Sequence, residues 1–289
     1  MSAHAAPTAR LTLGDIAKKK AAGEPIVMVT AYDYPSAQIA DEAGVDMVLV
    51  GDSGAMTVLG YDSTVPVTTD EMLMLTKAVR RGLTRPLLVG DLPFGSYEAS
   101  DELAIATAQR CIKEAGVDLV KIERGGTTVD RARALVNAGI PVVGHVGLTP
   151  QTATALGGYR AQGRTADAAL AVIDDALALQ NAGVSLIVVE AVPSPLMAEL
   201  APLLRIPTIG IGAGAEADGQ VLVFHDLLGV YDGPAAKFVK RYADVRGVSV
   251  DGVTAYVAEV RSGAYPAAEH TYGMSEHELA RLRELLAGR

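Results

Sequence analysis

Several short apolar segments of this chain end in ionisable residues, and these residues are the first candidates for chemistry. The run Val48-Leu49-Val50 leads to a glycine and then to an acid and a hydroxyl. A β-branched run that stops at glycine is typical of a buried strand that delivers polar groups at its carboxyl end. Four further apolar runs end in a similar way. The candidate functional residues are Asp52, Ser53, Asp91, Lys121, Glu123, His145 and Glu190.

Three of these candidates, Asp52, Asp91 and Glu123, are carboxylates from successive apolar runs. Carboxylate oxygens suit a hard divalent cation such as Mg²⁺, which also keeps water positions that a substrate can displace. A structural zinc site is disfavoured because the chain has one cysteine, Cys111, and five scattered histidines. Each acid taken singly could instead cap a helix or pair with a lysine. Three acids at successive run ends favour the metal site.

A divalent cation with open positions could chelate a 2-oxo acid and lower the free energy of the enolate that forms when the neighbouring C–H loses its proton. Lys121 and the hydroxyl of Ser53 could hold the substrate carboxylate. A separate carboxylate must take the proton, and Glu190 is the free candidate, although it could also be a capping or ion-paired acid. His145 could orient a ligand, bind product or serve as an ordinary hydrogen-bonded histidine.

These residues can act together only if the ends of their strands meet. In a closed barrel of parallel strands all carboxyl ends converge on one mouth, where barrel enzymes place their chemistry. Apolar runs and helical patterns alternate through the chain. Strands are expected at 25–31, before 52 and 91, at 119–123, before 145, and at 186–190, 207–211 and 220–224. This alternation predicts a single (β/α)8 TIM barrel, which needs about 250 residues.

Helix signals divide the chain further. We expect a flexible N-terminus over 1–10 and a barrel domain over 11–262 that starts with a short helix near 16–20, a possible plug for the lower end of the barrel. The last barrel helix is expected to start within 234–241. A C-terminal extension over 263–289 carries an extra helix, opened by a capping box at 275–278, with Leu279, Leu282 and Leu286 on one stripe. Asp33 could reach the mouth, but its position favours a helix cap.

The loop over 147–163 is too long and too rich in glycine for a plain connection. Such a segment at the mouth of a barrel is a candidate lid. The amino-acid composition limits the kinds of side chain that such a lid could cover. The chain of 289 residues has 49% hydrophobic residues but three Phe and no Trp, which predicts an aliphatic interior without large aromatic platforms.

Charge and hydropathy exclude several classes of partner. A formal net charge of −9 argues against general binding to nucleic acid or to a membrane surface, which needs clustered Lys and Arg. The chain has no run approaching the roughly 20 apolar residues of a membrane-spanning helix, and its first residues lack the features of a signal peptide. A single cysteine forms no internal disulfide, and Cys111 is expected to be a buried apolar side chain. We therefore expect a soluble cytoplasmic protein that acts on small molecules.

At the candidate residues the sequence closely resembles the ketopantoate hydroxymethyltransferase family, across about residues 11–272. The ordered matches are Thr30-Ala31-Tyr32-Asp33-Tyr34, Val50-Gly51-Asp52-Ser53, Asp62-Ser63-Thr64, Asp91-Leu92-Pro93-Phe94, Val120-Lys121-Ile122-Glu123, Gly144-His145-Val146-Gly147-Leu148-Thr149-Pro150-Gln151, Gly157-Gly158-Tyr159, Gly210-Ile211-Gly212-Ala213-Gly214 and Asp218-Gly219-Gln220.

The resemblance implies a Mg²⁺-dependent transfer of a one-carbon unit from 5,10-methylenetetrahydrofolate to 3-methyl-2-oxobutanoate, giving 2-dehydropantoate for pantothenate and coenzyme A synthesis. It assigns the metal to Asp52, Asp91 and Glu123, and proton abstraction to Glu190. It assigns the oxo acid to Asp52, Ser53, Asp91 and Lys121. It also implies a homo-oligomer, a decamer of barrels. No local motif in the chain identifies a site for the pterin of folate.

The sequence departs from the family pattern in two loops beside the expected metal site. Gly54-Ala55-Met56 stands where the family usually has Leu-Gly-Met, and Arg124 displaces the glycine pair that follows the Lys-Ile-Glu motif. Two rival functions remain: a metal-dependent carbon–carbon lyase of the related oxo-acid barrels, and a non-catalytic barrel within an assembly. The intact acids and Lys121 count against the second.

Overall fold

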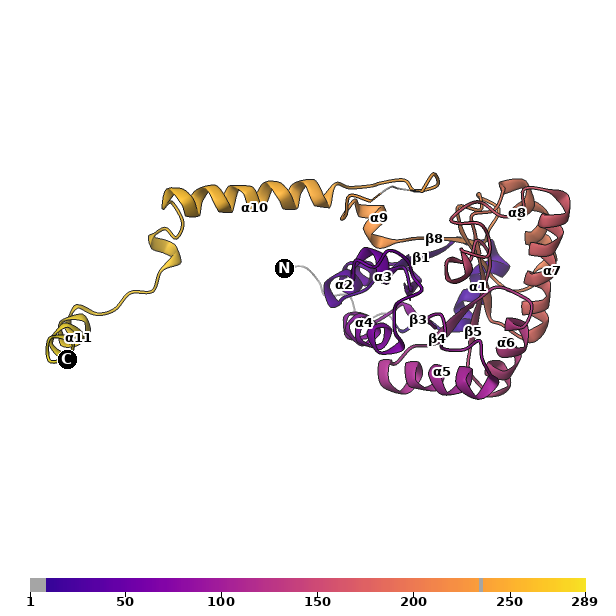
Figure 1. Ribbon diagram of the computed structural model, residues 1–289, viewed down its shortest axis with the longest axis horizontal. Coiled ribbons are helices and arrows are strands. Elements are labelled where there is room, and N and C mark those ends of the chain that lie inside the picture. The colour runs from indigo at the N-terminus through magenta and orange to yellow at the C-terminus, as the bar shows by residue number, and fades with distance from the viewer. Residues whose placement is uncertain (1–8, 234–235) are drawn as a thin grey trace. The chain divides into compact units, whose positions relative to one another are not determined.

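The computed structural model describes residues 9–233 and 236–289. Within these residues, eight parallel strands pair in sequence order, and the last pairs with the first, so that the sheet closes into a barrel (Figure 1). The predicted TIM barrel is thereby confirmed. The strands are β1 (Ile26–Thr30), β2 (Met47–Val50), β3 (Leu87–Asp91), β4 (Leu119–Glu123), β5 (Val142–Gly147), β6 (Leu186–Glu190), β7 (Thr208–Ile211) and β8 (Gly219–Leu222).

Helices follow most of the strands around the barrel, with none between β7 and β8, and several of them begin where polar side chains cap them. Asp33 accepts a hydrogen bond from the backbone N–H of Ser36 at 2.7 Å, which confirms the predicted cap. Gly116 and Gly183 end two other helices in the left-handed conformation. The helices of this part are α1 (Leu13–Ala22), α2 (Tyr34–Glu42), α3 (Gly54–Thr57), α4 (Thr69–Gly82), α5 (Asp101–Ala115), α6 (Thr128–Asn137), α7 (Ala166–Ala182), α8 (Ser194–Leu200) and α9 (Phe224–Leu228), with short 3-10 turns η1 (Pro150–Thr152) and η2 (Ala201–Leu203).

The period of two along each strand separates two buried layers. On β4, Leu119 lies in the cluster that fills the barrel, whereas Val120 and Ile122 lie in the cluster between strands and helices. Lys121 and Glu123 share the face of Leu119, as the alternation predicts, and therefore point into the barrel above it. The fold thus brings two ionisable side chains of one strand to the interior at its carboxyl end.

Helix α1 closes the other end of the barrel. A capping box between Thr12 and Asp15 starts the helix. Its one buried residue, Ile16, lies in the cluster that fills the barrel interior, together with inward-facing residues such as Met28 and Met47. The structure therefore supports the predicted role of this helix as a plug.

The last strand of the barrel and the helix after it differ from the prediction. Strand β8 ends at Leu222 rather than at residue 224, and helix α9 begins at Phe224. The expected start of a last barrel helix within 234–241 is wrong for residues 236–241, which are not helical, and residues 234 and 235 lie outside the described range. A helix begins instead at Val245, where Asp244 accepts a hydrogen bond from the backbone N–H of Gly247. The N-cap residue Asp244 therefore sets this start.

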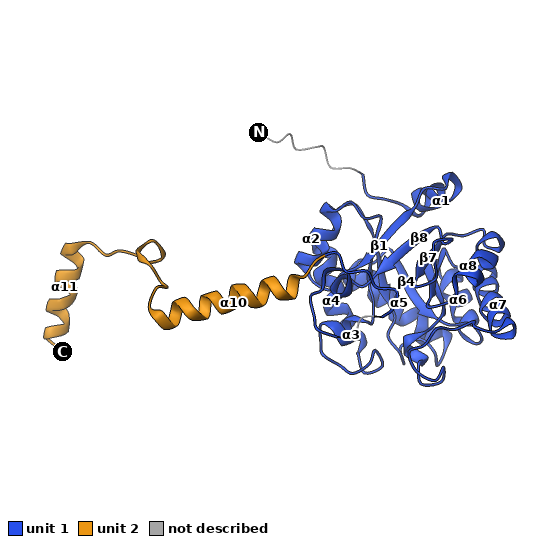
Figure 2. Ribbon diagram, turned by 90° about the horizontal axis from the view of Figure 1, so that it is seen from above, with its two compact units in different colours: residues 1–242 blue, residues 243–289 orange. Residues whose placement is uncertain are grey.

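The chain divides into two compact units, residues 1–242 and 243–289, coloured separately in Figure 2. The second unit contains α10 (Val245–Ser262), a 3-10 turn η3 (Ala268–His270) and α11 (Glu276–Ala287). This division places α10 outside the barrel unit, whereas the expected barrel domain ran to residue 262. Ser275 caps α11 through the N–H of Glu278. No helix of the described residues has the length and apolarity to cross a membrane.

Candidate active site

All seven candidate residues line one cavity of about 470 Å³ in the barrel unit. Strand register brings them there. Asp91 is opposite Lys121, Glu123 is opposite His145, and Glu190 is opposite Gly147 along neighbouring strands. The cavity is also lined by Met56, Pro150 and Tyr159 from loops and by the apolar side chains Val188, Ile211, Val221 and Phe238. The strand ends therefore converge at one mouth, as expected.

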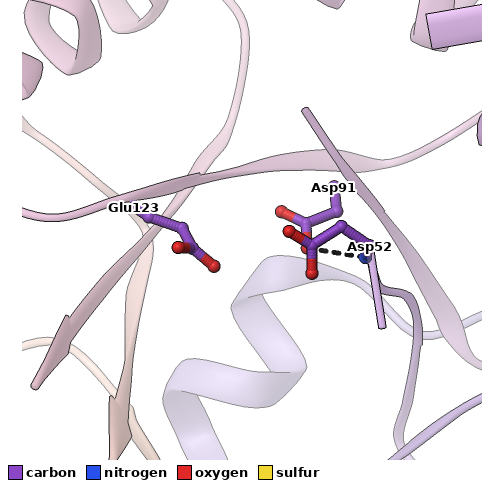
Figure 3. Close-up of side chains that lie close together, drawn as sticks. All are labelled: Asp52, Asp91 and Glu123. Carbon is purple, nitrogen blue, oxygen red and sulfur yellow. Dashed lines mark hydrogen bonds between the residues drawn. The ribbon is translucent and has the colours of Figure 1, made fainter. Parts of the chain in front are cut away.

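Asp52, Asp91 and Glu123 form a buried carboxylate trio in which one oxygen of each lies within 4.8 Å of the others (Figure 3). The backbone N–H of Asp52 donates to Oδ2 of Asp91 at 3.1 Å, which fixes the end of β2 against the end of β3. Oxygen donors at this spacing suit a hard divalent cation. Glu190 does not belong to this group.

Lys121 lies among the three acids. Its Nζ is 2.8 Å and 2.7 Å from the oxygens of Asp91 and 3.0 Å from Oε1 of Glu123. Burial alone would lower the pKa of Lys121, but the charges of the carboxylates outweigh it and hold that pKa well above its usual value. The ammonium therefore stays charged at neutral pH and offsets one of the three negative charges.

The trio still carries more negative charge than its surroundings compensate. Burial, and then repulsion from Asp91 and Glu123, raises the pKa of Asp52 well above its usual value. Burial also raises the pKa of Asp91, against the opposing effect of Lys121. A divalent cation would remove this repulsion, since it favours the ionised form of all three acids. The electrostatics and the donor set therefore both fit a metal ion such as Mg²⁺.

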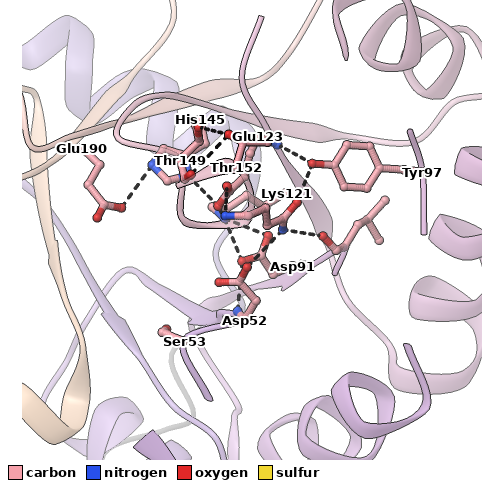
Figure 4. A network of polar contacts seen from close by, with 12 residues as sticks. Asp52, Ser53, Asp91, Tyr97, Lys121, Glu123, His145, Thr149, Thr152 and Glu190 are labelled. Atoms are coloured by element: carbon pink, nitrogen blue, oxygen red, sulfur yellow. Dashed lines mark hydrogen bonds and ion pairs between the residues drawn. The ribbon is translucent and has the colours of Figure 1, made fainter. Parts of the chain in front are cut away.

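His145 joins the trio to Glu190 (Figure 4). Its Nδ1 is 3.1 Å from Oε1 of Glu123 and its Nε2 is 3.2 Å from Oε2 of Glu190. Burial and the charge of Lys121 lower the pKa of His145, but Glu123 and Glu190 outweigh them and raise it to about 9. The side chain of Glu190 is 15% exposed to the cavity, against 2% for His145. Glu190 is thus the more accessible of the two groups.

A close backbone approach fixes the position of Glu190. Gly147, at the end of β5, has φ +93°, and a Cβ added to it would lie 2.2 Å from the carbonyl oxygen of Glu190. Only glycine fits there. The next residue, Leu148, donates its N–H to the same carbonyl at 2.9 Å. The loop after β5 therefore rests directly on the end of β6.

The hydroxyl of Ser53 lies 2.8 Å from the hydroxyl of Tyr32. Burial raises the pKa of Tyr32 to about 12, so Tyr32 remains protonated at neutral pH. Ser53 is at the cavity wall and directly follows Asp52. Its hydroxyl can therefore hydrogen-bond a ligand while Tyr32 restrains it.

Sequence reasoning missed two buried residues that contact the trio, Tyr97 and Gln151. Gln151 lies in a segment that matches the family, but its side-chain partners cannot be read from spacing. Tyr97 follows the β3 turn without any pattern that marks it. The candidate lid was recognised by its glycines, and one of its residues, Tyr159, lines the cavity with its hydroxyl 3.9 Å from Sδ of Met56. Closure of this loop stays a prediction.

Chemically, the cavity combines an oxygen-rich site for a divalent cation, a fixed ammonium and hydroxyl that can bind a carboxylate, and a separate glutamate. These parts suit proton removal next to the carbonyl of an oxo acid, which needs a Lewis acid and a general base on different residues.

Comparison with known structures shows the same barrel. A phosphonopyruvate hydrolase in complex with oxalate and Mg²⁺ superposes with a TM-score of 0.59 at 10% identity, covering 96% of this chain and 98% of that chain. The phosphoenolpyruvate phosphomutase of Streptomyces platensis subsp. rosaceus gives 0.57 at 14% identity, covering 94% and 97%. Identities this low establish the fold alone.

Comparison of sequences is more specific. The profile of the family described as ketopantoate hydroxymethyltransferase matches residues 10–268. The 3-methyl-2-oxobutanoate hydroxymethyltransferase of Oleidesulfovibrio alaskensis is 51% identical over 288 residues, covering 100% of this chain and 99% of the relative. The enzyme of the same name from Geobacillus kaustophilus is 53% identical, covering 91% and 95%. This chain therefore belongs to the ketopantoate hydroxymethyltransferase family.

Proposed function

We propose that this protein transfers a hydroxymethyl group from 5,10-methylenetetrahydrofolate to 3-methyl-2-oxobutanoate, giving 2-dehydropantoate, with Mg²⁺ bound by Asp52, Asp91 and Glu123. The observation that carries the proposal is one cavity holding a buried carboxylate trio and, beyond His145, a separate glutamate. Membership of the family supports the same reaction. The magnesium ion would supply Lewis acidity at the keto oxygen of the substrate.

The protein's own groups orient the substrate. The cavity lining includes Lys121, Ser53, Asp52 and Asp91. These residues would fix the oxo acid, its carboxylate held by the ammonium and the hydroxyl. Since Lys121 stays charged, this contact is a charge-assisted hydrogen bond. The isopropyl group would then face the apolar wall that includes Val188, Ile211 and Val221.

Glu190 would accept the proton from C3 of the oxo acid. Removal of this proton leaves the electron pair in an enolate, whose C3 forms the new C–C bond to the one-carbon unit. Both C–N bonds that join the methylene carbon to N5 and N10 of folate break: one is replaced by the new C–C bond, and the other by a C–O bond to the oxygen of water. The proton taken from C3 and the remaining proton of water pass to the two nitrogens, and tetrahydrofolate leaves. His145, with its raised pKa, would hold a proton between Glu123 and Glu190 and keep the base in place.

Assembly into a homo-oligomer is part of the proposal. Val248, Val253 and Tyr256 on α10 are 75%, 62% and 54% exposed within the single chain. Apolar side chains along one helix favour burial against another surface. The expected decamer gives the size to test by light scattering. The proposed location is the cytoplasm, since the one-carbon donor belongs to intracellular metabolism.

An activity assay tests the proposal. The purified protein is incubated with Mg²⁺ and 3-methyl-2-oxobutanoate, with or without 5,10-methylenetetrahydrofolate, and 2-dehydropantoate is measured by mass spectrometry. Product should appear only when both the folate and the metal are present, and EDTA should suppress it. Consumption of an oxo acid without folate, with formation of smaller fragments, would instead indicate a carbon–carbon lyase.

A further inference from the structure

Gln151 contacts two members of the carboxylate trio, one through its side-chain amide and one through its backbone. Its Nε2 donates to Oδ2 of Asp52 at 3.1 Å, and its backbone N–H donates to Oε2 of Glu123 at 3.1 Å. One residue therefore contacts the first and the third acid of the trio, which come from different strands. We propose that Gln151, oriented by Tyr97, is a positioning residue that holds Asp52 and Glu123 at the separation needed to bind a divalent cation.

The orientation of the amide is dictated by its neighbours. Nε2 faces two groups that can only accept, Asp52 and the carbonyl oxygen of Leu92 at 2.9 Å. Oε1 accepts from the hydroxyl of Tyr97 at 2.7 Å. A flipped amide would set its oxygen against a carboxylate and a carbonyl, so the observed orientation is the one that satisfies the hydrogen bonds.

Tyr97 closes the network on the other side (Figure 4). Its hydroxyl oxygen accepts from the backbone N–H of Glu123 at 3.2 Å and gives its own proton to Gln151. The hydrogen bonds thus run in one direction, from Glu123 through Tyr97 and Gln151 to Asp52. Such a chain is more rigid than separate contacts, because each bond polarises the next.

Burial makes this network hard to replace. Tyr97 and Gln151 are 1% and 4% exposed, so solvent has little access to the groups that would lose a partner. A buried polar group without a partner is costly. Loss of the amide would therefore let Asp52 move away from the two acids that repel it.

The separation of the Asp52 and Glu123 carboxylates matters because Mg²⁺ demands near-ideal octahedral geometry. Like charges push the three carboxylates apart, as the raised pKa of Asp52 reflects. Gln151 takes one oxygen of Asp52 and one of Glu123, and a carboxylate offers about four lone-pair sites, so positions for a cation remain. Outer hydrogen bonds of this kind orient metal ligands, and their loss typically weakens metal binding about 10- to 100-fold.

Gln151 also connects the trio to the loop over 147–163. It lies in η1 at the start of this loop, where the hydroxyls of Thr149 and Thr152 are 2.7 Å apart. The loop base is therefore bonded directly to the proposed metal ligands. Metal binding should in turn stabilise the loop base, because coupling between two sites is reciprocal.

The inference rests on the proposed Mg²⁺ site, and its test measures binding rather than turnover. Metal-free full-length protein is titrated with MgCl₂ by calorimetry, and the melting temperature is recorded with and without metal. The variants are Gln151→Leu, Tyr97→Phe and a control, Gln180→Leu. Gln180 is a similarly buried amide whose Oε1 accepts from the backbone of Arg205 at 2.6 Å.

We expect Gln151→Leu to weaken Mg²⁺ binding about 10- to 100-fold. Tyr97→Phe should weaken it by a smaller factor, because the amide remains but loses the group that orients it. Gln180→Leu should lower the melting temperature of the metal-free protein and leave Mg²⁺ affinity unchanged. In the wild type, and not in Gln151→Leu, Mg²⁺ should slow hydrogen exchange of the backbone in residues 148–153.

Three outcomes would overturn the inference. Unchanged Mg²⁺ affinity in Gln151→Leu, with normal binding by the wild type, removes the positioning role and leaves the proposed function intact. Equal weakening in Gln180→Leu shows a general loss of stability instead. No Mg²⁺ binding by the wild type overturns the proposed metal site together with this inference. If Gln151→Leu does not fold, Tyr97→Phe decides, since it removes a single oxygen.

Discussion

His145 and Glu190 are in ion-pair contact, with Nε2 of the histidine 3.2 Å from Oε2 of the glutamate. The other ring nitrogen of His145 contacts Glu123. The imidazole therefore separates Glu190 from the carboxylate trio while holding it at the same cavity. Among the described residues, Glu190 is not part of the group close enough to share a metal ion. A glutamate held apart from the metal site is free to act as a base.

Replacing Asp91 tests the metal site. Asp91→Asn keeps the shape and can still accept a hydrogen bond from Lys121, but it removes one of three negative charges. We expect Mg²⁺ affinity to fall by at least about tenfold, in line with the loss of a carboxylate ligand. The metal-free protein should stay folded, because repulsion with Asp52 is relieved. Calorimetric titration checks the first expectation and circular dichroism the second. An unchanged Mg²⁺ affinity would remove Asp91 from the site.

Arg124, one of the departures from the family pattern, carries backbone strain. Its φ is 68°, in the left-handed region that costs a non-glycine residue roughly 1–2 kcal/mol. Glycine avoids this cost but loses about 0.5–1 kcal/mol through the entropy of the unfolded chain. Arg124→Gly should therefore raise the free energy of unfolding by up to about 1 kcal/mol. Urea denaturation measures it, with Arg124→Ala as the control that keeps the strain. A glycine variant less stable than the alanine variant would contradict this account.

Cys111 should be unreactive in the folded protein. Burial raises the pKa of its thiol to about 11, which keeps it protonated at pH 8. Because the folded pKa is raised, the contribution to stability is present below the ordinary thiol pKa and is lost as pH rises through about 11. A colorimetric thiol reagent at pH 8 should react slowly in buffer and fast in urea. Rapid, complete reaction of the folded protein would show that the thiol is accessible.

The C-terminal helix should serve assembly or stability. Leu279, Leu282 and Leu286 are 36%, 41% and 56% exposed on α11, and a lone helix of this length is marginal in water. Deleting residues 273–289 should reduce the oligomer size or the melting temperature. Leu282→Ser should act in the same direction as the deletion, and Arg283→Ser should not. If the deletion left both light scattering and melting unchanged, the helix would have neither role.

Most of the barrel could be predicted because it is built from local patterns. Strand β6 agrees with the predicted 186–190 because it is a continuous apolar run. Helix α7 before it also has local signals, since Thr165 caps its start and Gly183 ends it. Convergence of the candidate residues followed from topology, since parallel strands in a closed barrel share one end. The spacing of apolar residues and the capping residues therefore predicted both the fold and the site residues that lie on strands.

Other parts of the site depend on contacts that spacing does not encode. The substrate contact of Lys121 stays a prediction, but spacing did not show that its Nζ lies 2.7 Å from Oδ2 of Asp91. Gln151 and Tyr97 lie outside the strands, where no period indicates which way a side chain points. The expected helix start within 234–241 is wrong for residues 236–241, and the helix begins after Asp244, whose side chain caps it.

The central claim is that Glu190 removes the C3 proton, and hydrogen exchange measures this step without the later carbon transfer. Exchange of the C3 hydrogen of 3-methyl-2-oxobutanoate for deuterium is followed by NMR in D₂O, with Mg²⁺ and without folate. Glu190→Gln should slow exchange by about two to four orders of magnitude while Mg²⁺ binding persists. The same substitution at the exposed Glu199 of α8 should have no effect. Exchange at the wild-type rate in Glu190→Gln would contradict the account and make His145 the next candidate base.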